Sequence, residues 1–222
     1  MKDSIAGIDY RFDDPCLLEE ALTHRSIGAG NNERLEFLGD SVLGMVISSR
    51  LFERFPDAPE GDLTRMRARL VRGSTLARLG KELNLGREIM MDPGVMKSAG
   101  FRNASILADA VEALIGAIYL DGGYAAVRAV VLEKFEPLIE DLPSIEQLKD
   151  PKTRLQEWLQ ARSRPLPRYT LEFEEGMPHA RTFYVSCRLE DGSRSEAQGS
   201  SRGAAEQAAA AAMLDKLQGE AA

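Results

Sequence analysis

Apolar residues recur at three- and four-residue intervals through most of the first 140 positions, a spacing typical of helices that bury one face. These repeats cover residues 17–22, 35–52, 63–85 and 106–120. Glycine- and proline-containing breakers at 28–30, 56–61, 93–94 and 122–123 separate them. The pattern predicts an all-helical unit over residues 1–142, in which 63–85 is treated as one helical segment.

A different pattern begins after residue 142. The polar stretch 143–150, bracketed by prolines, predicts a linker, and a short helix is expected at 152–161. Apolar and polar residues then alternate around 169–173 and 183–189, and a weaker strand is expected at 194–199. An alanine-rich helix at 202–217 completes an α-β-β-β-α order. Residues 151–222 are therefore predicted to form a small α+β domain, with three antiparallel strands covered by two helices.

Composition restricts the chemistry. The chain has 222 residues, 44% of them hydrophobic, so it can bury a core. No apolar run reaches the ~18 residues of a membrane span, and the first residues lack the apolar region of a secretory signal. Two cysteines, Cys16 and Cys187, are too few for a disulfide scaffold or a zinc finger. With only two histidines as well, a metal would need oxygen ligands, which suits Mg²⁺ or Mn²⁺.

Two apolar helices carry carboxylates on one face. Glu33, Glu36 and Asp40 are spaced i, i+3 and i+7, and Asp109 and Glu112 are spaced i, i+3. Acidic side chains on such helices are costly to bury unpaired, so they need either arginine partners or a divalent cation. Two such helices in one chain favour the cation. A Mg²⁺ site of this kind could support hydrolysis of a phosphodiester.

Segment 32–41, with the sequence NERLEFLGDS, closely resembles the signature of bacterial ribonuclease III. The resemblance continues at 22–26, 60–67, 105–116, 150–157 and 199–202, and so covers nearly the whole chain in the domain order of that family. It implies a helical endonuclease domain that forms a homodimer, followed by a domain that binds double-stranded RNA. His24, within the Thr-His-Arg-Ser stretch, is expected to be structural.

The resemblance also implies residue roles and a reaction. It assigns Mg²⁺, with Mn²⁺ possible, to Glu36, Asp40, Asp109 and Glu112, of which Asp40 and Glu112 are the most critical for turnover. Glu33 and Glu60 match secondary acidic positions, and Phe37 is expected to insert into a pocket of the partner subunit. The products would carry 5′-phosphate and 3′-hydroxyl ends. Ribosomal RNA precursors and some messenger RNAs in the cytoplasm are the expected substrates.

Duplex RNA should be contacted by three regions of the C-terminal domain, in the manner of domains that read shape across two minor grooves. The expected residues are Thr153, Gln156, Glu157, His179, Ser201 and Arg202. The family usually clusters basic residues at the start of the last helix, whereas here Arg202 precedes Gly203 and Ala204. We therefore expect weak RNA affinity of this domain alone. The alternative is a folded appendage, with arginines of the first domain making most contacts.

Several alternatives remain open at this stage. Phe37 could be ordinary core. Arg65, Arg69 and Arg72 would share a helical face that is either solvated or bound to phosphate, and Arg67 would point away. The formal net charge of −7 argues weakly against a nucleic-acid partner, but the local arrangement of charge matters more. A catalytically silent RNA-binding regulator should lack one of the four assigned acids, yet all are present. A purely structural helical dimer would not need the second domain.

Overall fold

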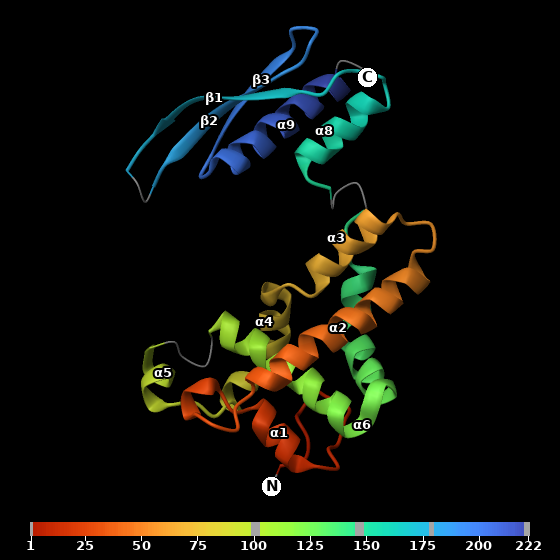
Figure 1. The fold of residues 1–222 in the computed structure, drawn as a ribbon, viewed down its shortest axis with the longest axis vertical. Coiled ribbons are helices and arrows are strands. Elements are labelled where there is room, and N and C mark those ends of the chain that lie inside the picture. The colour runs from red at the N-terminus through yellow and green to blue at the C-terminus, as the bar shows by residue number, and fades with distance from the viewer. Residues whose placement is uncertain (1, 99–102, 145–148, 178–179, 220–222) are drawn as a thin grey trace. The chain divides into compact units, whose positions relative to one another are not determined.

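The structure is a computed structural model that describes residues 2–98, 103–144, 149–177 and 180–219. The chain divides into two compact units, Met1–Leu142 and Pro143–Ala222. Figure 1 shows helices in the first unit and a sheet with two helices in the second. Among the described residues, no helix is both long and apolar enough to cross a membrane.

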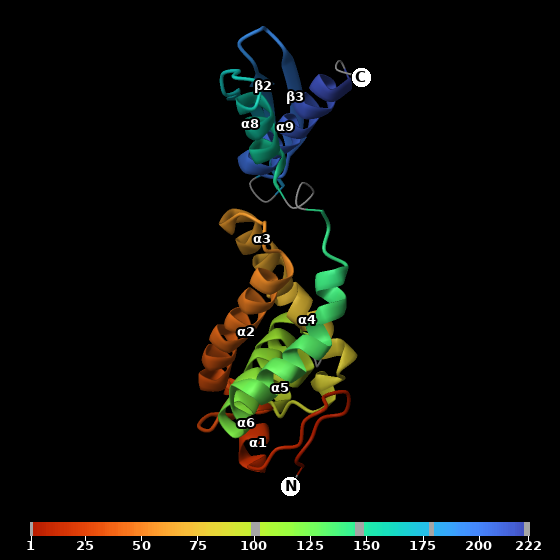
Figure 2. The same ribbon diagram turned by 90° about the vertical axis from the view of Figure 1, so that its right-hand side faces the viewer.

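The first unit is built from helices, as predicted. They are α1 (Pro15–Ala21), α2 (Glu33–Arg54), α3 (Glu60–Leu70), α4 (Gly73–Glu82), α5 (Pro93–Ser98) and α6 (Ala104–Glu140). Short 3₁₀ turns cover Arg25–Ile27 and Leu85–Arg87. Helix α6 is interrupted at Gly123, whose φ of 72° is readily adopted only by glycine. Helices α2 and α6 pack against each other, and Figure 2 shows α2 along one edge of this unit.

The prediction of a single helical segment at 63–85 is wrong. Helix α3 ends at Leu70, and Arg72 is extended, with φ −65° and ψ 147°, before α4 begins at Gly73. The hydroxyl of Thr75 donates to the carbonyl of Arg69 at 3.1 Å, which satisfies an acceptor at the end of α3. Residues 60 and 61, expected within the breaker 56–61, instead lie in the first turn of α3.

Two glycines allow α2 and α6 to approach closely. A Cβ atom added to Gly39 would lie 1.7 Å from the carbonyl oxygen of Glu112, and one added to Gly116 would lie 2.3 Å from that of Leu35. The helices therefore meet backbone to backbone at this point. Buried apolar side chains such as Leu43 extend the contact along the two helices. This crossing brings residues 36–40 of α2 next to residues 109–112 of α6.

The second unit has the predicted α-β-β-β-α order. Its elements are α8 (Pro151–Gln160), β1 (Arg168–Glu175), β2 (Thr182–Arg188), β3 (Arg194–Gly199) and α9 (Arg202–Gly219). The strands form an antiparallel sheet in the order β1-β2-β3, with Tyr169 opposite Cys187 and a register shift between Leu171 and Phe173. Both helices lie on one face of the sheet (Figure 1), where α9 packs against β2 and β3 and α8 packs against α9. Their core includes Leu155, Leu159, Val185, Ala209 and Met213.

Candidate active site

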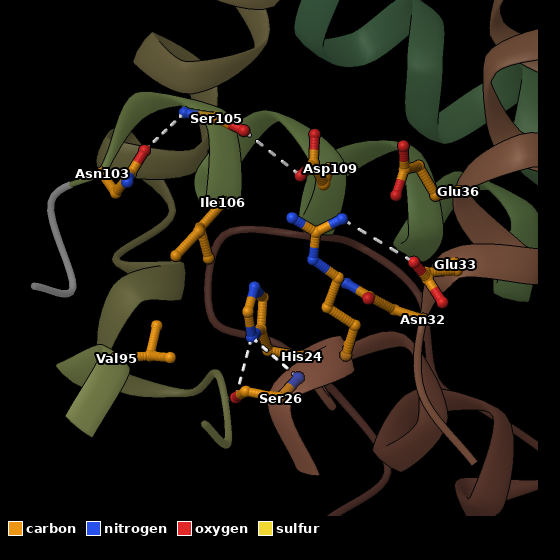
Figure 3. A pocket seen from close by; sticks show the side chains of 11 residues that line it. His24, Ser26, Asn32, Glu33, Glu36, Val95, Asn103, Ser105, Ile106 and Asp109 are labelled. Atoms are coloured by element: carbon orange, nitrogen blue, oxygen red, sulfur yellow. Dashed lines mark hydrogen bonds and ion pairs between the residues drawn. The ribbon is translucent and has the colours of Figure 1, made fainter. Parts of the chain in front are cut away.

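The α2–α6 crossing gathers three carboxylates that are distant in sequence. Glu36 of α2 and Asp109 and Glu112 of α6 each offer an oxygen atom, and these atoms lie within 4.8 Å of one another. All three side chains are half-buried. Figure 3 shows Glu36 and Asp109 entering the site from their two helices. Gly39 lies one turn from Glu36, and Gly116 lies one turn from Glu112. These glycines let the two helices approach closely enough for the acids to meet.

Burial makes this acidic cluster unfavourable as a set of free charges. It raises the pKa of Glu112 to about 7, and the charges of Asp40, Glu36 and Asp109 add to that effect. Burial also raises the pKa of Glu36 and that of Asp109. A divalent cation would relieve the repulsion, and hard oxygen donors without sulfur or imidazole suit Mg²⁺ or Mn²⁺. The donor set therefore fits a divalent metal ion.

The other predicted acids lie at different distances from this cluster. Asp40 is exposed one turn beyond Glu36, and its charge contributes to the raised pKa of Glu112. Glu33 is exposed, with its Oε1 atom 3.9 Å from Nη1 of Arg25. Glu60 accepts a hydrogen bond from Thr64 and lines a different hollow. One protomer thus places Asp40 and Glu33 beside the cluster but does not place Glu60 there.

An open cavity of about 710 Å³ adjoins the acids, a size typical of ligand pockets. Its lining includes Glu33, Glu36, Asp109, His24, Arg25, Ser26, Asn103 and Ser105. Asn103 caps α6 by accepting from the N–H of Ser105, whose hydroxyl lies 3.4 Å from Asp109 Oδ2 (Figure 3). The Nδ1 atom of His24 bonds the hydroxyl of Ser26 at 2.9 Å, which agrees with the structural role expected for His24.

Sequence reasoning did not identify Arg25, Asn103 or Ser105 as part of this site. Arg25 lay inside the family-like stretch 22–26, and Asn103 precedes an apolar helical repeat as a helix cap often does. The sequence therefore contains a signal for Arg25 and for Asn103. The position of these residues beside the acids depends on the tertiary fold and carries no sequence pattern of its own.

The run of arginines on and after α3 does not form one face. Arg65 donates to the buried carboxylate of Asp62 at 2.7 Å, and Arg67 donates to the hydroxyl of Ser48 at 3.0 Å. Arg72 precedes α4. Arg65 thus has a structural partner, whereas the exposed side chains of Arg67 and Arg69 remain candidates for phosphate contact.

Phe37 is not core in the protomer. Its side chain is 78% exposed, although it lies on α2 between the buried Leu35 and Gly39. Met45 and Phe52 are also exposed large apolar residues on this helix, about two turns apart along one broad face. Several large apolar side chains exposed on one face of a helix are typical of an interface with another molecule.

Helices α8 and α9 of the second unit begin next to each other, and the predicted RNA contacts Thr153, Ser201 and Arg202 lie at these two helix starts. Asp150 caps α8 by accepting from the N–H and the hydroxyl of Thr153, at 3.0 and 2.8 Å. The N–H of Lys152 donates to the side chain of Gln207 in α9 at 3.0 Å. Gln156 and Glu157 are exposed on the next turn of α8. The predicted contact His179 lies outside the described residues.

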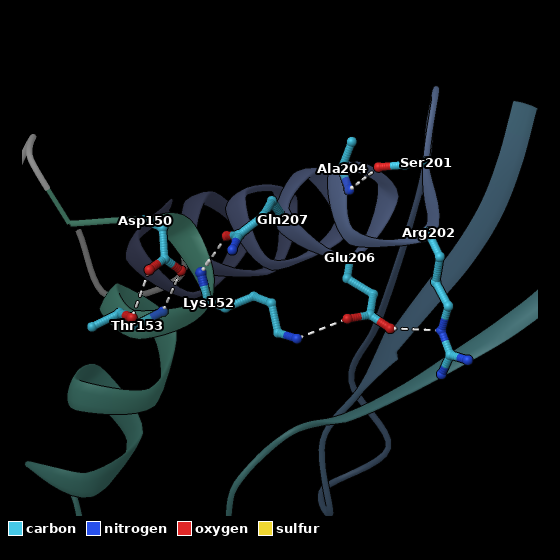
Figure 4. Close-up of polar contacts among 8 residues, drawn as sticks. All are labelled: Asp150, Lys152, Thr153, Ser201, Arg202, Ala204, Glu206 and Gln207. Atoms are coloured by element: carbon cyan, nitrogen blue, oxygen red, sulfur yellow. Dashed lines mark hydrogen bonds and ion pairs between the residues drawn. The ribbon is translucent and has the colours of Figure 1, made fainter. Parts of the chain in front are cut away.

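Glu206 holds two cations at this junction. Nε of Arg202 lies 3.0 Å from one carboxylate oxygen of Glu206, and Nζ of Lys152 lies 2.8 Å from the other (Figure 4). These ion pairs lower the pKa of Glu206, with the hydrogen bond from Lys152 as the largest cause. Arg202, expected to be the cation that meets phosphate, is thus already paired. Lys152 joins it there, which the sequence pattern did not reveal.

Comparisons with known proteins place this geometry in a family. A family model described as ribonuclease-III-like matches residues 14–138, and one described as a double-stranded RNA binding motif matches residues 151–217. A protein named Ribonuclease 3 from Xanthomonas axonopodis pv. citri (strain 306) is 54% identical over 211 residues, covering 95% of this chain and 93% of that protein. Ribonuclease 3 from Alkalilimnicola ehrlichii (strain ATCC BAA-1101 / DSM 17681 / MLHE-1) is 53% identical over 219 residues, covering 98% and 96%.

A solved structure agrees with the helical unit. The nuclease domain of ribonuclease III from Campylobacter jejuni matches with a TM-score of 0.57 and 44% identity, covering 58% of this chain and 90% of that one. That structure is described as flexible in a region involved in dimer formation. The chain belongs to the ribonuclease III family of double-strand-specific endoribonucleases, with a ribonuclease-III-like nuclease domain followed by a double-stranded-RNA-binding domain.

Proposed function

We propose that residues 1–142 hydrolyse both strands of duplex RNA with Mg²⁺, or alternatively Mn²⁺, while residues 151–222 bind the duplex and residues 143–150 join the two domains. The observation that carries this proposal is the meeting of Glu36, Asp109 and Glu112 within 4.8 Å at the α2–α6 crossing, with Asp40 beside them. A set of partly buried acids in this position has no evident structural purpose, because burial makes it unfavourable without a cation.

Four of the acids share one task in this scheme, which is to hold the metal ion. Glu36, Asp40, Asp109 and Glu112 would hold the metal ion, which when bound lowers the pKa of water and stabilises charge on the phosphate. Burial and the neighbouring acids raise the pKa of Glu112 to about 7 in the metal-free protein, and a bound cation would favour the charged carboxylate that holds it. Ser105 orients Asp109. Glu33 and Glu60 have secondary roles.

The products would follow from where the phosphodiester breaks. The oxygen of water bonds to phosphorus, and the bond from phosphorus to the 3′ oxygen breaks. The released strand ends then carry a 5′-phosphate and a 3′-hydroxyl. A two-fold dimer supplies one acidic cluster for each strand, and Phe37 would fill a pocket of the partner subunit.

We place this activity in the cytoplasm, on ribosomal RNA precursors and some messenger RNAs that fold into duplexes. The duplex would contact Thr153, Gln156, Glu157, Ser201, Arg202 and the loop of His179. A silent RNA-binding regulator is disfavoured, because all four proposed metal ligands are present. Cleavage by the wild-type protein distinguishes the nuclease from that regulator.

The test compares cleavage and binding by the same protein preparation. Glu112→Ala should abolish cleavage of a long RNA duplex in Mg²⁺ but retain duplex binding in a gel-shift assay. Glu133→Ala, an exposed glutamate farther along α6, is the matched control and should cleave normally. EDTA should stop the wild-type protein. Near-normal turnover by Glu112→Ala would overturn the assignment of the site, and an inactive wild-type protein that still binds RNA would indicate the regulator.

A further inference from the structure

Arg25 has a fixed backbone and a loosely held side chain. The N–H of His24 donates to the carbonyl of Met90 at 2.9 Å, and the N–H of Asp92 donates to the hydroxyl of Ser26 at 2.9 Å. These bonds secure the residues on both sides of Arg25 to another segment of the chain. Its own side chain is 71% exposed, so the guanidinium can change position while the backbone stays in place.

The guanidinium of Arg25 lies among the acids without a close partner there. Its Nη1 atom is 3.9 Å from Glu33 Oε1, which is too long for a hydrogen bond. Its charge lowers the pKa of Glu36 and of Asp109, against the larger effect of burial. Among the described residues that line the cavity, Arg25 is the one arginine or lysine. Arg50, farther along α2, pairs with Glu136 instead.

We propose that Arg25 is the counter-ion of the acidic cluster in the metal-free protein, and that it turns to a phosphate oxygen of the RNA strand when a divalent cation occupies the cluster. The inference rests on the proposed metal-dependent nuclease function. A guanidinium and a divalent cation repel each other, so both cannot be held closely by the same acids. Guanidinium also matches the geometry of a phosphate group better than any other side chain does.

This double role has two consequences of opposite sign. Removing the charge of Arg25 removes a competitor of the metal ion, so the RNA-free protein should bind the metal ion more tightly. The same change removes a phosphate contact, so cleavage of RNA should become less efficient. If Arg25 merely supported the fold of the site, its substitution would weaken both metal binding and RNA cleavage. If it were a solvated surface arginine, its substitution would change neither.

The experiment uses the full chain and Mn²⁺ as the probe. Calorimetric titration without RNA should show that Arg25→Gln binds Mn²⁺ about three- to tenfold more tightly than the wild type. Its kcat/KM on duplex RNA in saturating Mg²⁺ should fall about ten- to a hundredfold, the effect of one lost charge-assisted contact. Arg25→Lys should lie between Arg25→Gln and the wild type in cleavage. Arg11→Gln, another exposed arginine paired with an acid, is the matched control and should match the wild type in both assays.

Glu112→Gln in the same titration separates the inference from the function on which it rests. If Glu112→Gln and the wild type bind Mn²⁺ equally, the proposed metal site fails and the inference fails with it. If they differ but Arg25→Gln binds Mn²⁺ no more tightly than the wild type, the inference alone is wrong. Wild-type kcat/KM in Arg25→Gln would overturn it as well.

Discussion

Glu112 links the stability of the metal-free protein to pH. Burial and three acidic neighbours raise its pKa from 4.5 to about 7, so the fold favours its protonated form. The stabilisation from this group is complete below about pH 4.5 and is lost as the pH rises through 7. In EDTA, the Tm of the wild type should therefore fall more between pH 5 and 8 than that of Glu112→Gln. Parallel Tm profiles of the two proteins would contradict the raised pKa.

The acids of the site could be predicted from sequence, whereas their cationic neighbours could not. Glu36 and Asp109 stand out because each lies on an apolar helix, three residues from another acid on the same face. Arg25 and Lys152 have no comparable pattern. Arg25 lies 3.9 Å from Glu33, and Lys152 lies 2.8 Å from Glu206. In each case the two residues belong to separate elements that only tertiary structure brings together.

Helix α2 can meet α6 only because residue 39 has no side chain. An alanine methyl group at this position would lie 1.7 Å from a backbone oxygen of α6, so the helices would have to separate. Gly39→Ala should therefore destabilise the chain by about 1–3 kcal/mol or more and reduce cleavage by spreading the acids. Denaturant unfolding and an RNA cleavage assay would measure the two effects.

Gly44 of the same helix is the matched control for Gly39. A Cβ atom there would meet nothing within 4 Å. Gly44→Ala should therefore be neutral, or stabilise the helix by up to about 1 kcal/mol through helix propensity. If both alanine variants behave alike, the close approach of the helices is not what positions the acids.

The start of α9 should accept the basic residues that this chain lacks. Gly203 and Ala204 are exposed, and a Cβ atom at Gly203 would meet nothing within 4 Å. Replacing both with lysine should tighten duplex binding. The slope of log K against log salt concentration should steepen by up to about two, because each phosphate contact contributes about 0.9 to it. Binding is measured in EDTA, and thermal unfolding is followed because helix propensity at residue 203 also rises.

Gln218→Lys provides the charge control, since residue 218 is exposed near the opposite end of α9. It should leave the salt slope unchanged. If the two lysines at 203 and 204 also change neither slope nor affinity, the duplex does not contact the start of α9, and the pairing of Arg202 with Glu206 has no bearing on RNA binding.

Most elements could be predicted because local patterning and tertiary packing agree in them. The third strand, 194–199, has the expected bounds, since a tight turn at 190–193, in which Gly192 has a φ of 87°, fixes where the strand begins. The break between α3 and α4 was missed for a physical reason. Apolar positions such as Leu70 and Leu76 are buried on both sides of the break, so they give no sign of it, and the bond from Thr75 to Arg69 that stabilises it does not affect periodicity.

Assembly of the whole molecule should depend on Phe37. The similar nuclease domain from Campylobacter jejuni has a region involved in dimer formation, and the ring of Phe37 is exposed and available for the proposed partner pocket. Phe37→Ala should weaken the dimer by about 3–5 kcal/mol if the ring is fully buried in the complex. Sedimentation across a concentration series would measure this change. Phe173→Ala, an exposed aromatic of the second unit, is the control, and an unchanged Phe37→Ala dimer at low concentration would exclude the interface role.

The central claim is that α2 and α6 together build one metal site. Crystals of the full chain grown or soaked with Mn²⁺ test it directly, because anomalous scattering locates the ion without reference to activity. We expect a peak among Glu36, Asp109 and Glu112, at about 2.1 Å from their carboxylate oxygens. A peak at another place in the molecule, or no peak at a Mn²⁺ concentration that supports cleavage, would contradict the account.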